Sequence, residues 1–313
     1  MWDENRKQGS STLTKKATQK NKHEVSVREC LRCSVVPCVD FYSSGRKLEG
    51  GELYILRMMI KKNLHTPCEV GGLIYSLCKL SEPLTKLLSY PLFIQCIRDL
   101  KASAFLLLCG HYRSSMQILR PVIENYLAGV YFDNKLVSAQ SEEERKSIQE
   151  DFERFCDGKY EIPEEEYLEI YPKQKKRKKL LDHNFLLRWI MNKKLVSGRT
   201  KDRLEKRIGL LNRYLHPHFP FTEITKPSCP ECPALVNYDE EEYRHCVELF
   251  QDVMTDLLSL IYTYVRSYFP DKLQSEEVKE AVTWLQEIEE MEKDIGMPII
   301  YSKELRNFIK TLS

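Results

Sequence analysis

The amino-acid sequence predicts an all-α fold, a helical bundle with peripheral helices that follows a disordered basic tail. Three observations support this prediction. Apolar residues recur at helical spacing over long stretches, as on the buried face of a helix. Several of these stretches open with Asp, Ser or Thr followed by Glu, the usual chemistry of a helix N-cap. No stretch alternates strictly between apolar and polar residues, so no half-buried strand is expected.

The chain begins with a polar tail followed by two modest helices. Residues 1–28 are rich in Lys, Ser, Thr, Gln and Asn and lack periodicity, so we expect them to be disordered. The tail has no apolar segment after its charges, so it is not a secretory signal, and we expect a cytoplasmic protein. Amphipathic helices are predicted over 52–64 and 69–80, with the turn-like HTPC between them.

The most apolar part of the chain runs from 90 to 134 and is the predicted centre of the bundle. Apolar side chains recur at helical spacing from Phe105 to Val130. We therefore expect one long helix, or two helices stacked end to end. Pro121 lies inside this segment and cannot donate a hydrogen bond to the carbonyl of Gln117, so a kink or a break is expected there.

The rest of the chain completes one bundle domain, predicted to span 29–270. Within it, 136–180 is a charged insertion that contains an acidic, tyrosine-rich stretch and the basic run Lys173–Lys179. A C-terminal helical extension is expected over 271–313. Further helices are predicted over 141–155, 182–195, 200–216, 239–269, 275–295 and 302–312.

Composition excludes several classes of function. The net charge is only +2, so any binding of nucleic acid must come from a local patch. No apolar run approaches the roughly 20 residues that cross a bilayer, and no Gly-rich phosphate loop, HExxH or GxSxG motif occurs. Five cysteines in apolar helical contexts are predicted to be reduced core thiols: Cys78, Cys96, Cys109, Cys156 and Cys246.

A polar stripe lies on the predicted central helix. Arg113, Gln117, Arg120 and Glu124 are four, three and four residues apart, so they share one face. Two interpretations stay open. Arg120 pairs with Glu124 one turn away while Arg113 reaches solvent along its aliphatic stem. Alternatively, the stripe faces a cleft, where Arg113 and Arg120 bind phosphate or a carboxylate.

The stretch LNRYLHPHFPFTEITKPSCPEC, residues 211–232, contains the densest set of chemically reactive side chains. Its helix must end near His216, because Pro217 disfavours helical backbone in the residue before it. In one interpretation His216 is structural, because a protonated histidine in the last helical turn interacts favourably with the negative end of the helix dipole. Alternatively, a closed structural zinc site is formed by His216, His218, Cys229 and Cys232.

A second CxxC pair, Cys30 with Cys33, has no evident local partners. We expect these two cysteines to be plain thiols. The alternative is that they join Cys229 and Cys232 in a four-cysteine site.

Arg213 and His218 have the form R-x4-H, and here the chain resembles the HEPN superfamily of all-α bundles. The text YRSSMQILRPVIENYLAGVYFD, residues 112–133, also resembles a helix of families related to that superfamily. The resemblance covers about 90–270. It implies RNA as the partner, dimerisation around the motif and metal-independent cleavage. Arg213 would then stabilise phosphate charge, and His218 would handle the proton of the attacking 2′-hydroxyl.

Two functions therefore stay open. The first is an HEPN-like protein that binds RNA and cleaves it with the Arg213–His218 pair, without a cofactor. Its phosphate contacts would be Arg113, Arg120, Lys175, Lys176, Arg177 and Lys178. The second is a non-catalytic helical scaffold or interaction protein, stabilised by structural zinc, in which the charged run is only a solvated surface.

Overall fold

The computed structural model describes residues 66–172, 181–196, 198–215, 240–295, 300 and 302–312. Within these ranges the chain forms ten α-helices and two short 3-10 helices, and no strand. The all-α prediction is confirmed. The predicted tail and the predicted helix over 52–64 lie outside the described residues. No helix in the described ranges combines the length and the apolar character needed to span a membrane.

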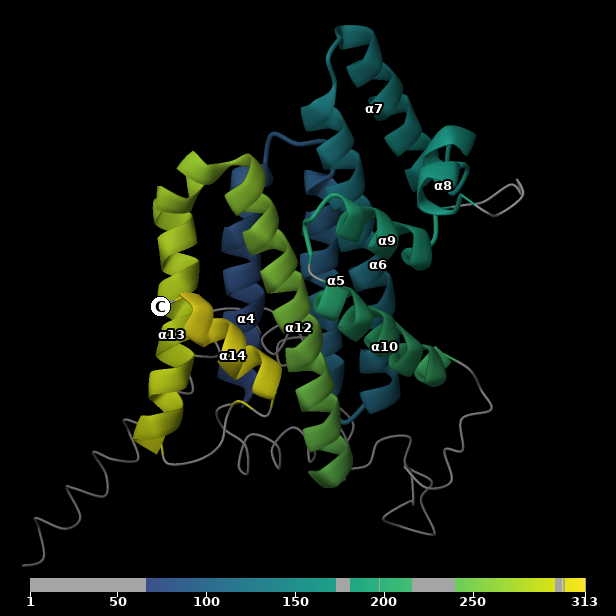
Figure 1. The fold of residues 1–313 in the computed structure, drawn as a ribbon. Coiled ribbons are helices and arrows are strands. Elements are labelled where there is room, and N and C mark those ends of the chain that lie inside the picture. Colours follow the sequence, from purple (N-terminus) through teal and green to yellow (C-terminus); the bar gives the residue numbers. More distant parts are fainter. Residues whose placement is uncertain are drawn as a thin grey trace, which may run out of the picture.

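The centre of the fold is a helical hairpin rather than one long helix. α5 spans Tyr90–Leu108 and α6 spans Tyr112–Ser138. The two helices pack side by side (Figure 1). The prediction of a single helix, or of two stacked end to end, is therefore wrong. α6 also continues through Pro121, so the predicted break at that proline does not occur.

The reversal between the two helices is made by Gly110. Its φ of 80° lies in the left-handed region that favours glycine. The Gly110 N–H donates to the Leu107 carbonyl at 3.1 Å, and the His111 N–H donates to the Leu106 carbonyl at 2.8 Å. These two bonds form a Schellman motif, which ends α5 and turns the chain back along it.

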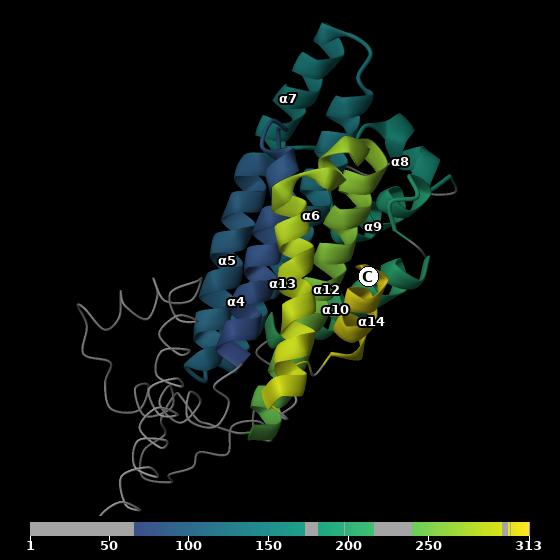
Figure 2. The same ribbon diagram turned by 90° about the vertical axis from the view of Figure 1, so that its left-hand side faces the viewer.

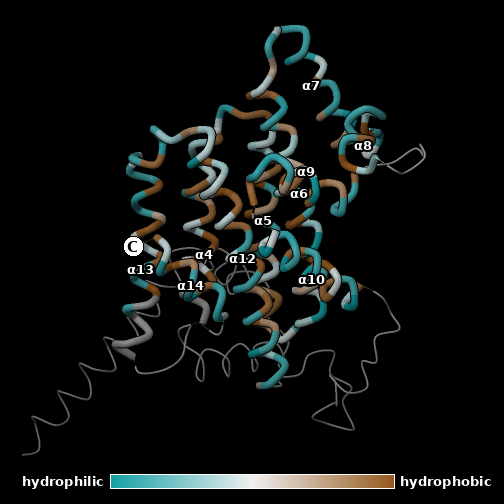
Figure 3. The backbone as a smooth tube through the Cα atoms, in the orientation of Figure 1, coloured by the Kyte–Doolittle hydropathy of each residue, from teal (hydrophilic) through white to brown (hydrophobic). Residues whose placement is uncertain are grey.

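Three further long helices complete the bundle. α4 (Thr66–Ser81) packs against α5 and against both α12 (Glu240–Tyr268) and α13 (Glu276–Ile295). Figure 2, which turns the molecule by 90°, shows these helices running alongside one another. Hydrophobic and hydrophilic stretches alternate along them (Figure 3), and their apolar faces share one core. Its largest fully buried side chains include Phe93, Tyr126, Tyr131, Phe132, Tyr243, Phe250 and Tyr264.

Shorter helices surround this bundle. α9 (His183–Asn192) and α10 (Gly198–Leu215) lie against α6, and α14 (Lys303–Leu312) lies against α12. At one end of the molecule, α7 (Glu142–Cys156) and α8 (Glu164–Ile170) extend beyond the bundle (Figure 1). α8 was not predicted.

Predicted N-cap residues accept backbone hydrogen bonds at the start of four helices; before α13 the Val278 N–H donates to Ser275 Oγ at 3.4 Å. The Glu144 N–H donates to Ser141 Oγ at 3.1 Å at the start of α7, and the Phe185 N–H donates to Asp182 Oδ1 at 2.8 Å at the start of α9. Ser302 Oγ likewise accepts from the Leu305 N–H at 3.1 Å before α14. Each bond satisfies a backbone donor that the first helical turn leaves open, which is why these residue patterns marked helix starts correctly.

The five cysteines whose side chains the structure describes are free thiols. Cys96, Cys109 and Cys246 are buried, and Cys78 is partly buried, as predicted. Burial raises the pKa of the Cys246 thiol to about 12, so it stays protonated and unreactive near neutral pH. Cys156 is exposed at the end of α7, so its prediction as a core thiol is wrong.

Candidate functional site

The polar stripe on α6 makes two separate sets of contacts. Arg120 Nε lies 3.1 Å from Glu124 Oε1, so the predicted pair one helical turn apart is confirmed. The same carboxylate oxygen lies 3.4 Å from Nδ1 of His183, the first residue of α9. Burial favours a neutral Glu124, but the His183 hydrogen bond and the Arg120 charge outweigh it and hold the pKa of Glu124 below its usual value. Arg120 therefore has a carboxylate partner within the protein.

The other half of the stripe binds the end of α10. The carbonyl oxygen of Tyr214 accepts from Arg113 Nε at 3.0 Å and from Gln117 Nε2 at 2.8 Å. The last carbonyls of a helix have no intrahelical donor, and a cation near them interacts favourably with the helix dipole. Arg113 and Gln117 thus cap α10 from a neighbouring helix. The interpretation in which Arg113 only reaches solvent is wrong.

This contact places Arg113 against the residue that follows Arg213 in the chain. Arg213 is exposed in the last turn of α10, directly before the carbonyl that Arg113 binds. We call Arg113, Gln117, Arg213 and Tyr214 the α6–α10 corner. The Tyr214 side chain points to α12, where burial and then the nearby Cys246 raise the pKa of its hydroxyl.

Several predicted site residues lie outside the described residues, so their roles stay predictions. They are the zinc and catalytic candidates His216, His218, Cys229 and Cys232, the second pair Cys30 and Cys33, and the basic residues Lys175, Lys176, Arg177 and Lys178. In the ranges that the structure describes, no group of three or more His, Cys, Asp or Glu side chains is arranged to hold a metal ion.

A buried ionic cluster between α10 and α12 was not predicted. The guanidinium of Arg207 contacts the carboxylate of Asp256, which is fully buried, and lies 2.9 Å from Asp252 Oδ2. Arg203 bridges Asp256 and Glu304, each at 2.7 Å. Burial raises the pKa of Asp256, although the two guanidinium groups oppose this effect. The cluster connects α10 and α14 to α12, and so it is structural.

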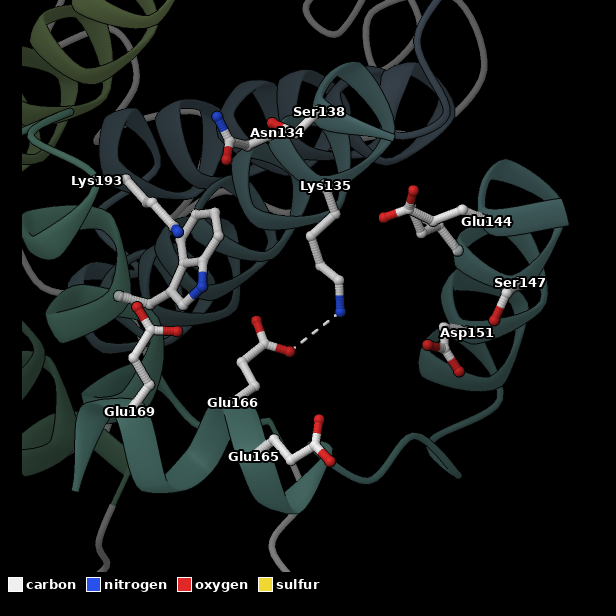
Figure 4. A pocket seen from close by; sticks show the side chains of 12 residues that line it. Asn134, Lys135, Ser138, Glu144, Ser147, Asp151, Glu165, Glu166, Glu169 and Lys193 are labelled. Carbon is white, nitrogen blue, oxygen red and sulfur yellow. Dashed lines mark hydrogen bonds and ion pairs between the residues drawn. The ribbon is translucent and has the colours of Figure 1, made fainter. Parts of the chain in front are cut away.

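A polar cavity lies at the end of the molecule where α7 and α8 extend from the bundle. It has a volume of about 500 Å³ and is bounded by α6, α7, α8 and α9 (Figure 4). Two lysines, Lys135 and Lys193, and the ring of Trp189 also line it. Carboxylates predominate on its walls: Glu144, Asp151, Glu165, Glu166 and Glu169. We call this cavity the acidic pocket.

Sequence reasoning did not detect the acidic pocket. The run of glutamates in 164–169 was the one available signal, but it was assigned to a charged insertion because helix α8 was missed. The pocket forms because α8 turns these glutamates toward the end of α6 (Figure 4).

Comparisons with protein-family profiles, with curated proteins and with solved structures found no match to this chain.

Proposed function

We propose that the protein is an HEPN-like helical protein that binds RNA through the α6–α10 corner. The observation that supports this is the contact between Arg113 and the carbonyl of Tyr214, the residue that follows the exposed Arg213. Guanidinium groups bind phosphate oxygens through paired N–H donors, and two of them at one corner suit adjacent phosphates. Arg120 contributes less in this proposal, because Glu124 already holds it.

Cleavage is the second part of the proposal. His218 would remove the proton from a 2′-hydroxyl, and Arg213 would stabilise the negative charge that develops on the phosphate. Histidine suits this role because its ordinary pKa lies near neutral pH. Binding and cleavage are separable, since Arg213 serves both and His218 serves cleavage alone.

The test uses a fluorescent single-stranded RNA, titrated with the full chain at several salt concentrations. Arg213→Ala should weaken binding and lower the slope of log affinity against log salt by about one. Lys206→Ala is the matched control, because Lys206 is an exposed cation on the same helix but outside the corner. Equal losses in the two variants would mean a diffuse charge effect and would refute the assignment of the corner. RNA cleavage unchanged by His218→Ala would refute the catalytic part.

A second function, that of a non-catalytic interaction protein, is favoured by the acidic pocket. Its volume of about 500 Å³ lies in the range of ligand-binding sites, and its excess of carboxylates would favour a cationic partner. This function does not depend on His218 or on the α6–α10 corner.

A further inference from the structure

Two side chains of opposite helices approach the same carboxylate oxygen on the polar stripe. Arg120 Nε lies 3.1 Å from Glu124 Oε1, and Nδ1 of His183 on α9 lies 3.4 Å from that oxygen. The three side chains are 28%, 32% and 21% exposed in the order Arg120, Glu124, His183, so solvent reaches each of them. Arg120 is therefore paired with a carboxylate for which a second side chain competes.

The net charge of these three side chains depends on His183. Arg120 is always protonated. Burial opposes the charge of Glu124, but its two neighbours hold the pKa of this group below its usual value, so it is a carboxylate near neutral pH. With a neutral imidazole the three charges sum to zero, and with an imidazolium they sum to one positive charge. Protonation also makes His183 a charged donor, whose hydrogen bond to a carboxylate is roughly twice as strong as that of a neutral donor.

Other charged groups near the start of α9 have contacts of their own. From α10, Glu205 acts on Tyr171 but is paired with Lys201 at 2.7 Å. On α9 itself, Arg188 lies over the Tyr171 ring, 5.1 Å from its centroid. The carboxylate of Asp182 accepts a backbone hydrogen bond as the N-cap of α9.

The carboxylates of α8, the third helix that packs against α9, lie farther along it. Those that line the acidic pocket lie beside Trp189, toward the other end of α9 from His183. Within the described residues, the carboxylate in contact with His183 is therefore that of Glu124.

We propose that Glu124 blocks Arg120 when His183 is neutral, and that protonation of His183 releases Arg120 to bind an RNA phosphate. This inference rests on the proposed binding of RNA at the α6–α10 corner and adds regulation by pH to it. Arg113 and Arg120 are seven residues apart on one face of α6, about 10 Å along its axis, so one strand can reach both. The proton comes from solvent and adds at Nε2, because Nδ1 faces Glu124. RNA binding should tighten as pH falls through the range in which histidine ordinarily titrates, about pH 8 to pH 5.

The first test repeats the titration of fluorescent single-stranded RNA with the full chain at pH 8 and at pH 5.5. The gain in affinity on acidification should be about fivefold larger in the wild type than in H183Q, whose glutamine stays neutral. The same comparison is then made in the R120A background. There H183Q should change the gain by less than about twofold, because no arginine is left at position 120 to be released.

The second test removes the competitor instead of protonating the histidine. E124Q should bind RNA about fivefold more tightly than the wild type at pH 8, since an amide does not hold the guanidinium charge. D151N is the matched control. Asp151 also pairs with an arginine of its own helix, Arg154 at 3.6 Å, but it lies on α7 and outside the polar stripe. Its loss should change RNA affinity by less than about twofold.

Three outcomes would overturn the proposal. They are an equal gain on acidification in wild type and H183Q, the same effect of H183Q with and without Arg120, and equal effects of E124Q and D151N, which would indicate long-range charge alone. A measurement without RNA separates these failures from failure of the proposed function. The Nε–H resonance of Arg120, assigned with R120K, should shift between pH 8 and pH 5.5 in the wild type but not in H183Q. This shift in a wild type that binds no RNA at either pH would refute the RNA proposal and the phosphate role of Arg120, and would leave the competition for Glu124 standing.

Discussion

Gly129 on α6 packs directly against the ring of Phe93 on α5. A Cβ atom at position 129 would lie 2.7 Å from Phe93 Cζ and 3.3 Å from Ser89 Cβ. The Phe93 ring is fully buried and stacks on Tyr126, with ring centroids 4.9 Å apart, so it has no free space to move into. The close approach of the two hairpin helices therefore requires glycine at this position.

Gly129→Ala should lower the free energy of unfolding by about 1–3 kcal/mol, because the added methyl group overpacks the hairpin. Gly209→Ala is the opposite case. Gly209 lies in α10, and no atom stands within 4 Å of the position its Cβ would take. Alanine there should stabilise the protein by about 0.5–1 kcal/mol through its higher helix propensity. Urea denaturation of both variants is the measurement. Equal effects of the two substitutions would contradict the packing of α5 on α6.

Asp133 is a fully buried carboxyl group that receives hydrogen bonds from Ser89, the N-cap of α5. The Ser89 N–H donates to Oδ1 at 3.1 Å, and the Ser89 hydroxyl donates to Oδ2. Burial raises the pKa of Asp133 to about 7, although the Ser89 hydrogen bonds oppose this effect. Between about pH 4 and pH 7, the folded protein therefore holds a proton that the unfolded chain has released. The contribution of Asp133 to stability consequently falls as pH rises through this range.

Asp133→Asn should remove this contribution, since the amide does not titrate and still offers an acceptor to the Ser89 N–H. The wild type should lose about 2 kcal/mol of stability relative to the variant between pH 5 and pH 7. Denaturation curves at several pH values for both proteins measure the difference. A constant gap between the two proteins across that range would show that Asp133 does not titrate there.

Arg207 is 7% exposed at its side chain and holds the buried carboxylate of Asp256. Arg207→Ala should destabilise the protein by about 3–5 kcal/mol, because it leaves a buried charge without its main partner. Lys206→Ala, at the next residue and exposed, should change stability by less than about 0.5 kcal/mol. Thermal unfolding of both variants tests this. A small effect of Arg207→Ala would mean that Arg203 alone suffices for Asp256.

Local patterns predicted those features that depend on neighbours in the sequence. The caps at Ser141 and Asp182 and the Arg120–Glu124 pair follow from residues within one helical turn of one another. The buried cysteines followed from apolar helical context. These interactions need no information about distant segments, which is why the sequence was sufficient for them.

The hairpin at Gly110 shows where the same reasoning failed. Apolar spacing continues through the turn, so periodicity alone predicted one helix, or two stacked end to end, where there are two helices side by side. A kink or a break was expected at Pro121; the helix does not break there, because α6 packs against several other helices and continues through the proline. Gly110 is the residue in the sequence that indicates the turn, because glycine readily takes the left-handed conformation found there.

The sequence by itself determined that this protein is all-α, where most of its described helices begin, and which side chains on α6 form a polar stripe. Only the tertiary structure decided what that stripe contacts, which acids Arg203 and Arg207 meet, and that the glutamates of α8 face α6 and α7 across a pocket. The physical reason is how far apart in the sequence the interacting residues lie. Helical periodicity and capping depend on residues within about four positions. The partners of a buried charge are set by helix packing, which brings together residues about 50 to 100 positions apart in the chain.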